Sequence, residues 1–243
     1  MNTTRSLDSQ IYKVGFWSVI TAFTMAIISG FFPLDAPGGS SVMDAERIAW
    51  LSVNSGVFAT GWAIQIIWMT AWCITMFVLA WKIRGGHPIQ AMFAAMVVLV
   101  SFMAFIIEKF MTIWTIPQLA DAVLNGSSGS EIADSLLPLL NHSFPFTLST
   151  SFGYLGLWMY GVFSLLVAVP LYRQSQQSVS IKITAVALGT FGILLHCMMV
   201  GIFVDVITSE DIYTFVDPFF LIIFLAFGAA AFNFKSTMSS ESR

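Results

Sequence analysis

The sequence predicts an all-α, polytopic membrane protein: a bundle of six transmembrane helices with both termini in the cytoplasm. Three observations predict it, namely the composition, six apolar segments of spanning length, and a one-sided distribution of cations. Hydrophobic residues make up 57% of the 243 residues and charged residues 9%, whereas soluble domains carry about a quarter charged residues. Lipid is therefore the expected solvent of this chain.

The apolar segments come first, because about 20 residues are needed to cross about 30 Å of hydrocarbon. Six segments meet that length: 14–32, 59–81, 90–116, 148–171, 183–206 and 213–234. Stretches rich in Gly, Pro and Ser separate them and predict loops. We expect residues 1–235 to form a single transmembrane domain and residues 236–243 to form a polar, frayed tail.

The two longest expected loops are 33–58 and 117–147. Within the second, apolar residues recur at helical spacing over 130–140 against acidic and hydroxyl residues. This pattern predicts either a short amphipathic helix on the membrane surface or a packed external loop.

The distribution of charge sets the expected orientation. If six spans alternate, one side of the membrane holds Arg5, Lys13, Lys82, Arg84, Arg173, Lys182, Lys235 and Arg243. The opposite loops hold Asp35, Asp44, Glu46, Asp121, Glu131, Asp134, Glu210 and Asp211, with Arg47 as their single cation. Because cytoplasmic loops carry the excess of Lys and Arg, the first side is predicted to be the cytoplasm.

Several classes of function are not supported by the sequence. The net charge is −3 and the cations are scattered singly, so we expect no nucleic-acid partner. No phosphate-binding loop, nucleophile elbow or zinc-protease motif is present, and no cofactor or catalytic residue can be identified. Histidines and acids lack the spacing of a metal site, so none is expected.

Polar residues inside the predicted spans are the candidate functional residues. A charged side chain at the centre of a span costs about 2.5–3.5 kcal/mol on insertion scales, so its presence calls for a partner or a function. A rise of about 1.5 Å per residue places the polar candidates in the outer half of the membrane. The expected ligand-binding residues are Glu108, His196, Gln65, Asp217, Trp68 and Trp72.

Helical spacing gives each candidate an orientation. Small and polar residues recur along one side of the third span, which predicts a face toward other helices: Ala94, Ser101, Ala104, Glu108, Thr112 and Thr115. The stripe supports either an outward-opening site in which Glu108 and His196 titrate or bind a ligand, or two buried groups whose hydrogen bonds fix the packing of the helices.

Other polar and aromatic residues carry weaker expectations. Lys109, adjacent to Glu108, is expected to stretch toward the outer headgroups. Asp217 is expected near a helix N-terminus, where a carboxylate is favourable. Trp68 and Trp72 lie four residues apart, which is typical of aromatic packing between helices or against lipid, with a hydrophobic ligand pocket as the alternative.

The order of features resembles a bacterial membrane family of six spans and about this length, known as a domain of unknown function. The resemblance rests on Ala45-Glu-Arg-Ile-Ala49 and Asn54-Ser-Gly-Val-Phe58, on the acid Glu108, and on Gly153-Tyr-Leu-Gly156 and Pro170-Leu-Tyr-Arg173. The third span lacks the Arg that precedes the acid in that family. The resemblance implies a multi-pass protein of the cell inner membrane, and it implies no activity.

Three functions are compatible with the sequence. The first is binding or moving a small lipophilic or protonatable ligand from the outer leaflet side, with Glu108 as the main polar contact. The second is an accessory or scaffold subunit that docks a membrane-protein partner. The third is an intramembrane enzyme acting on a lipid, with Glu108 and His196 as acid and base.

Overall fold

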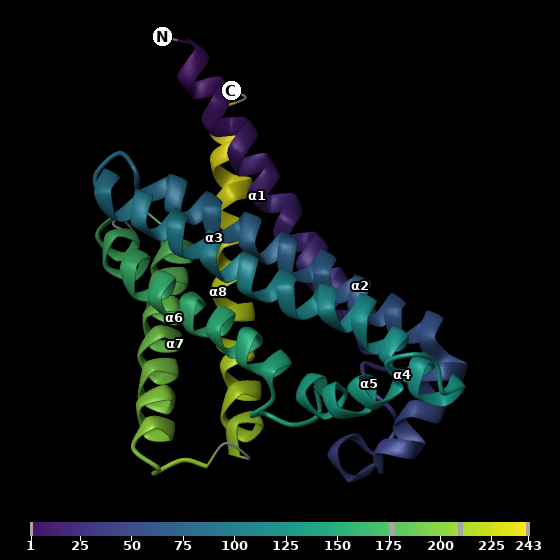
Figure 1. The fold of residues 1–243 in the computed structure, drawn as a ribbon. Coiled ribbons are helices and arrows are strands. Elements are labelled where there is room, and N and C mark those ends of the chain that lie inside the picture. Colours follow the sequence, from purple (N-terminus) through teal and green to yellow (C-terminus); the bar gives the residue numbers. More distant parts are fainter. Residues whose placement is uncertain (1, 175–177, 209–210, 242–243) are drawn as a thin grey trace. The chain divides into compact units, whose positions relative to one another are not determined.

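Apolar runs that end at Gly, Pro or polar stretches form the long helices of this chain. The computed structural model describes residues 2–174, 178–208 and 211–241 (Figure 1). Over these residues the chain is helical and contains no strand, and six helices are long and apolar enough to cross a membrane. The predicted fold class, an all-α multi-pass membrane protein, is confirmed.

The helices keep the expected order along the chain and are longer than expected. Two single-turn 3₁₀ helices, Gly39–Ser41 and Pro138–Leu140, lie in the connections. A π-helical segment, Met111–Thr115, joins the third helix to the fourth. The α-helices are α1 Asn2–Ser29, α2 Asp44–Ile83, α3 Pro88–Phe110, α4 Ile116–Asn125, α5 Ser130–Leu136, α6 Leu148–Gln174, α7 Val179–Phe203 and α8 Ile212–Glu241.

The first long loop was predicted too long. Residues 33–58 were expected to be a loop, but α2 begins at Asp44. Asp44 and Glu46 lie in its first turn, where carboxylates interact favourably with the helix dipole. Asn54 departs from helical geometry, with φ −113° and ψ 15°, so the helix has a local kink near the boundary that the sequence predicted.

The second long loop was also predicted too long, because helical structure continues to Asn125. Pro117 is tolerated there because it lies in the first turn of α4. Gly126 ends α4 in the left-handed conformation, with φ 57°. Helix α5 confirms the short helix predicted within 130–140.

At the C-terminus, α8 continues through Glu241 and so includes most of the segment expected to be a frayed tail. Ser242 and Arg243 lie outside the described residues, as does Glu210, which was counted among the acids of the outer loops.

The described chain divides into two compact units, and both are built from segments that are discontinuous in the sequence. The first unit is formed by Met1–Phe23, Met69–Phe102 and Leu157–Arg243, and the second by Thr24–Trp68 and Met103–Gly156. Helices α1, α2, α3 and α6 contribute residues to both units.

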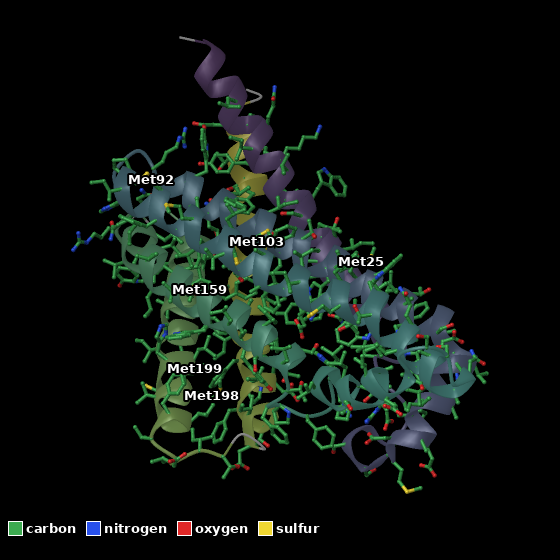
Figure 2. All side chains as sticks on the ribbon, in the orientation of Figure 1. Met25, Met92, Met103, Met159, Met198 and Met199 are labelled. Carbon is green, nitrogen blue, oxygen red and sulfur yellow. The ribbon has the colours of Figure 1, made fainter. Side chains whose placement is uncertain are left out.

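In the first unit, α7 and α8 lie side by side (Figure 1). The Thr184 hydroxyl on α7 donates a hydrogen bond of 3.1 Å to the carbonyl of Ala226 on α8. Side chains project from the helices in all directions, as Figure 2 shows. Among them, Met198 on α7 is buried. Between α1 and α2 of the same unit, the hydroxyl groups of Ser18 and Thr75 share a hydrogen bond of 2.8 Å. Helix–helix contact in this unit therefore combines apolar packing with hydrogen bonds of hydroxyl groups.

The second unit has a core of its own, formed by segments far apart in the sequence. Ile48, Leu51, Phe58 and Trp62 from α2 pack with Ile116. Ala120 and Leu140 complete the cluster. This core positions the candidate site described below.

A glycine on α7 is required for close packing against α6. A Cβ atom at Gly192 would lie 2.8 Å from the Leu165 side chain and 3.1 Å from the Gly161 carbonyl oxygen, whereas one at Gly189 would lie 3.4 Å from Ala168. We expect Gly192→Ala to lower the midpoint of thermal unfolding in detergent, with a cost of about 1–3 kcal/mol for overpacking.

Gly189→Ala is the matched control on the same helix. It adds an ordinary contact and gains helix propensity, so its unfolding midpoint should equal or exceed that of the wild type. Equal destabilisation by the two substitutions would show that close approach at Gly192 is not the cause.

Candidate functional site

A buried ion pair lies on α3 in the second unit. The Lys109 Nζ atom donates a hydrogen bond of 2.8 Å to Oε2 of Glu108, and the side chains are 11% and 2% exposed. Lys109 was expected to extend toward the headgroups, and that expectation is wrong. Adjacent side chains on a helix point in different directions, so this pair needs a cause. The attraction between opposite charges rises as the local dielectric constant falls, and the flexible Lys109 side chain therefore bends toward the buried carboxylate.

Two aromatic rings surround the ammonium group. Lys109 Nζ lies 4.9 Å from the ring centroid of Trp62 and 5.5 Å from that of Phe105. Trp62 is held in turn, because its indole N–H donates to the Leu34 carbonyl at 3.1 Å. Ring faces attract cations, so these contacts replace part of the hydration that the ammonium loses on burial.

The carboxylate of Glu108 faces a helix that has no side chain at that point. A Cβ atom at Gly153 on α6 would lie 2.8 Å from Oε1 and 2.9 Å from Oε2 of Glu108. Residue 153 must be glycine for the carboxylate to occupy this position.

His142 forms the third member of this group. Its Nδ1 atom lies 3.4 Å from Oε1 of Glu108, and its ring meets Trp62 edge to face at a centroid distance of 4.4 Å. The side chain is 30% exposed, yet the Nδ1 atom itself is buried. Burial, aided by the charge of Lys109, lowers the pKa of His142 from 6.5 to about 3, so the imidazole is neutral at pH 7.

A second buried cation lies in the same unit. Arg47 has a side chain only 9% exposed, and its Nε atom donates to Oδ1 of Asp35 at 3.1 Å. Nη2 donates to the Gly39 carbonyl at 2.6 Å. Gly39 has φ 57°, a left-handed conformation that favours glycine. Two of the three guanidinium nitrogens are thereby satisfied.

The third guanidinium nitrogen is different. Nη1 is buried and has no hydrogen-bond partner among the described residues, and Oδ1 of Asp44 lies 3.7 Å from it. Buried polar atoms in folded proteins are almost always hydrogen-bonded, so this nitrogen is suited to receive an acceptor from outside the chain.

Arg47 lines a cavity of about 40 Å³, which we name the Arg47 pocket. Its polar lining comes from residues that are well separated in the sequence. Its apolar wall comes from the core of the unit, including Ile48, Leu51, Phe58 and Ile116. The polar lining residues are Asp35, Asp44, Arg47, Asp134, Asn141 and His142.

The Arg47 pocket carries a negative charge. Three aspartates line it against one arginine, and His142 is neutral, so the sum of the charges is −2 at neutral pH. Asp44 is 68% exposed and Asp134 is also exposed, whereas Arg47 is buried. The pocket therefore has exposed aspartates at its mouth and a buried arginine in its lining.

The sequence-predicted residues have varied environments. Glu108 and four other members of its stripe, Ala94, Ser101, Ala104 and Thr112, are buried as predicted. The last member, Thr115, is only half-buried. In the second unit, the Gln65 side-chain amide donates to the Ser29 hydroxyl. This contact joins α2 to the end of α1, which gives Gln65 a structural role in helix packing.

His196, in the first unit, packs within the contact of α6 and α7. Its Nδ1 atom lies 2.7 Å from the Gly192 carbonyl oxygen, one turn earlier. Its ring meets that of Trp158 at 6.5 Å. A Cβ atom at Gly161 would lie 3.1 Å from the imidazole.

The remaining candidates are an aromatic pair and one acid. Trp72 is 3% exposed and contacts aromatic rings, including Tyr160 at 6.2 Å and Phe227 at 5.0 Å, which is the packing role named above as typical. Trp68 is half-buried and belongs to the second unit. Asp217 does not cap its helix: α8 begins at Ile212, so this exposed acid lies in the second turn.

Sequence reasoning missed the residues that form the Arg47 pocket. One signal was present, because Arg47 is the single cation among the acid-rich loops. A lone cation there has reason to be buried against acids. Its partners could not be found from spacing, since Asp35 and Asp134 are 99 positions apart.

Fold and site together define this chain as a multi-pass membrane protein with a polar pocket in one of its two units. No protein-family model, curated protein or solved structure matches the sequence. The resemblance to a six-span bacterial membrane family stays a prediction.

The ion pair on α3 gives a test by substitution. We expect Lys109→Met to destabilise the protein by about 3–5 kcal/mol at pH 8, because it leaves the Glu108 carboxylate buried without a counter-charge. The double variant Glu108→Gln/Lys109→Met removes both charges and should recover most of that loss. Thermal unfolding in detergent micelles measures both; a double variant as unstable as the single one would contradict this account.

His142 gives a test by pH. Its folded-state pKa lies below its unfolded-state value, so the unfolded chain takes up a proton between pH 6.5 and about 3 that the folded chain does not. The contribution of His142 to the free energy of unfolding is therefore fully present above pH 6.5 and decreases as the pH falls below that value. Between pH 7 and 5 the wild type should lose about 2 kcal/mol more than His142→Gln. Parallel unfolding curves of the two proteins across this range would disprove it.

Proposed function

We propose that this chain is a cell inner-membrane protein, with both termini in the cytoplasm, that binds a small protonatable ligand in the Arg47 pocket. The orientation rests on the cations at one side of the six spans and the acids at the other. In this orientation the residues of the Arg47 pocket belong to the outer segments, so the ligand approaches from the extracytoplasmic side.

The charge of the pocket supports a cationic ligand. Asp44 and Asp134 lie at the mouth, with only Arg47 to offset the three aspartates of the lining. An ammonium group placed there gains two charge-assisted hydrogen-bond acceptors. A carboxylate or phosphate at the same place would meet repulsion from both.

The observation that carries the proposal is the buried Nη1 atom of Arg47. A ligand that supplies a hydrogen-bond acceptor to this nitrogen removes the cost of leaving a buried charged donor unsatisfied. The preferred ligand is therefore a small organic amine that also carries an oxygen acceptor.

The size of the pocket sets an upper limit on what is enclosed. One water-sized position needs about 10–15 Å³ on this measure, so about 40 Å³ corresponds to about three such positions. Pockets that enclose whole drug-sized ligands measure about 300–1,000 Å³. The pocket thus fits the polar head of a ligand, and an apolar remainder would extend along Leu137 and the exposed mouth.

Ethanolamine is a suitable probe, because it combines an ammonium group with a hydroxyl acceptor. We expect ethanolamine to raise the unfolding midpoint of the purified protein, because binding at ten times the dissociation constant adds about 1.4 kcal/mol to the free energy of unfolding. Ethylene glycol has the acceptor without the charge and ethylamine has the charge without the acceptor. Both should give smaller shifts.

Substitutions locate the effect in the pocket. Asp134→Asn should abolish most of the ethanolamine shift, while Asp121→Asn, which removes an exposed carboxylate of α4 that does not line the pocket, should leave it unchanged. The proposal fails if ethylene glycol stabilises as strongly as ethanolamine, or if the two substitutions act alike.

A further inference from the structure

An apolar groove in the first unit is separate from the Arg47 pocket. It has a volume of about 520 Å³ and is lined by α1, α2 and α3, among others by Ile11, Val14, Phe77 and Met92. Met92 is exposed and labelled on α3 in Figure 2. The lining is almost entirely carbon, and its single charged member is Arg84.

The length of the groove corresponds to one leaflet of a bilayer. It extends from Ile74 on α2 to Arg84, the residue after the end of that helix, which at about 1.5 Å per residue is about 15 Å. The hydrocarbon core of a bilayer is about 30 Å thick, so one leaflet supplies about half of that. An extended acyl chain fits a groove of this length and lining.

The charges at one end of the groove favour an anionic headgroup. Arg84 lies there, stacked on Trp81 at 3.8 Å, and its Nη2 atom donates to Asp8 at 2.6 Å. Lys13 and Lys82 are adjacent in sequence to the lining residues Val14 and Trp81. Three cations against one acid leave a charge of +2 at this end.

We infer that the groove binds one acyl chain of an anionic glycerophospholipid, with the lipid phosphate beside Arg84. The apolar lining takes the acyl chain, and the cations take the phosphate, as in basic pockets between transmembrane helices. A second copy of the chain, which would cover the groove with protein, does not account for the excess of cations at its end. This inference is independent of the proposed amine ligand.

The test uses the full chain in nanodiscs with equal amounts of phosphatidylglycerol and phosphatidylcholine. The protein is released from the nanodiscs, and native mass spectrometry then counts the lipids that each protein retains. We expect the wild type to retain phosphatidylglycerol over phosphatidylcholine by about fivefold, the factor that one cation near an anionic headgroup supplies.

Two substitutions address the groove, each with a matched control. Ala95→Phe fills the groove, and Val186→Phe adds the same ring at an exposed position of α7 outside it. Arg84→Gln removes the cation of the lining, and Lys182→Gln removes an exposed cation on α7. The unfolding midpoint of each variant verifies folding.

Three results together support the inference. Ala95→Phe no longer retains phosphatidylglycerol, Arg84→Gln loses the fivefold preference, and the two control variants behave like the wild type. Equal retention by Ala95→Phe and Val186→Phe overturns it. So does equal retention of the two lipids by the wild type, or a dimer in lipid-free detergent that Ala95→Phe dissociates.

Discussion

The second unit depends on neutralising the carboxylate of Glu108. At 2% exposure this group has lost its water, and an isolated charge in such a place would cost several kcal/mol. Lys109 supplies the counter-charge at 2.8 Å, with Trp62 beneath the ammonium and the bare backbone of Gly153 beside the carboxylate. One charge thus constrains α2, α3 and α6 at once, because each must present a particular residue to it.

His142 links this ion pair to the Arg47 pocket. Its buried Nδ1 atom faces Glu108, and the residue also lines the pocket. Because the imidazole is neutral at pH 7, it adds no positive charge to oppose a cationic ligand. The ion pair and the Arg47 pocket therefore differ in net charge. The charges of Glu108 and Lys109 cancel, whereas the aspartates of the pocket outnumber its single arginine.

The first unit has a different chemistry. Aromatic rings around Trp72 and the contact of α7 with α8 stabilise it, and its exposed helix faces are apolar. Arg84 is the one charged residue that lines its apolar groove. We propose lipid headgroups and acyl chains as partners of this surface, and a small amine as the ligand of the acidic pocket in the second unit.

The sequence by itself determined the fold class, the six membrane-spanning helices and the buried stripe of Ala94, Ser101, Glu108 and Thr112, because hydrophobic length and helical periodicity are local properties. It placed helix ends less well, since apolar residues continue past the kink at Asn54 and through the π-helical segment Met111–Thr115. Only the tertiary structure decided that Lys109 turns inward, that Arg47 pairs with Asp35, and that Asp134 and His142 line the same pocket. Such contacts depend on which distant segments exclude water from a charge, and no local spacing encodes that.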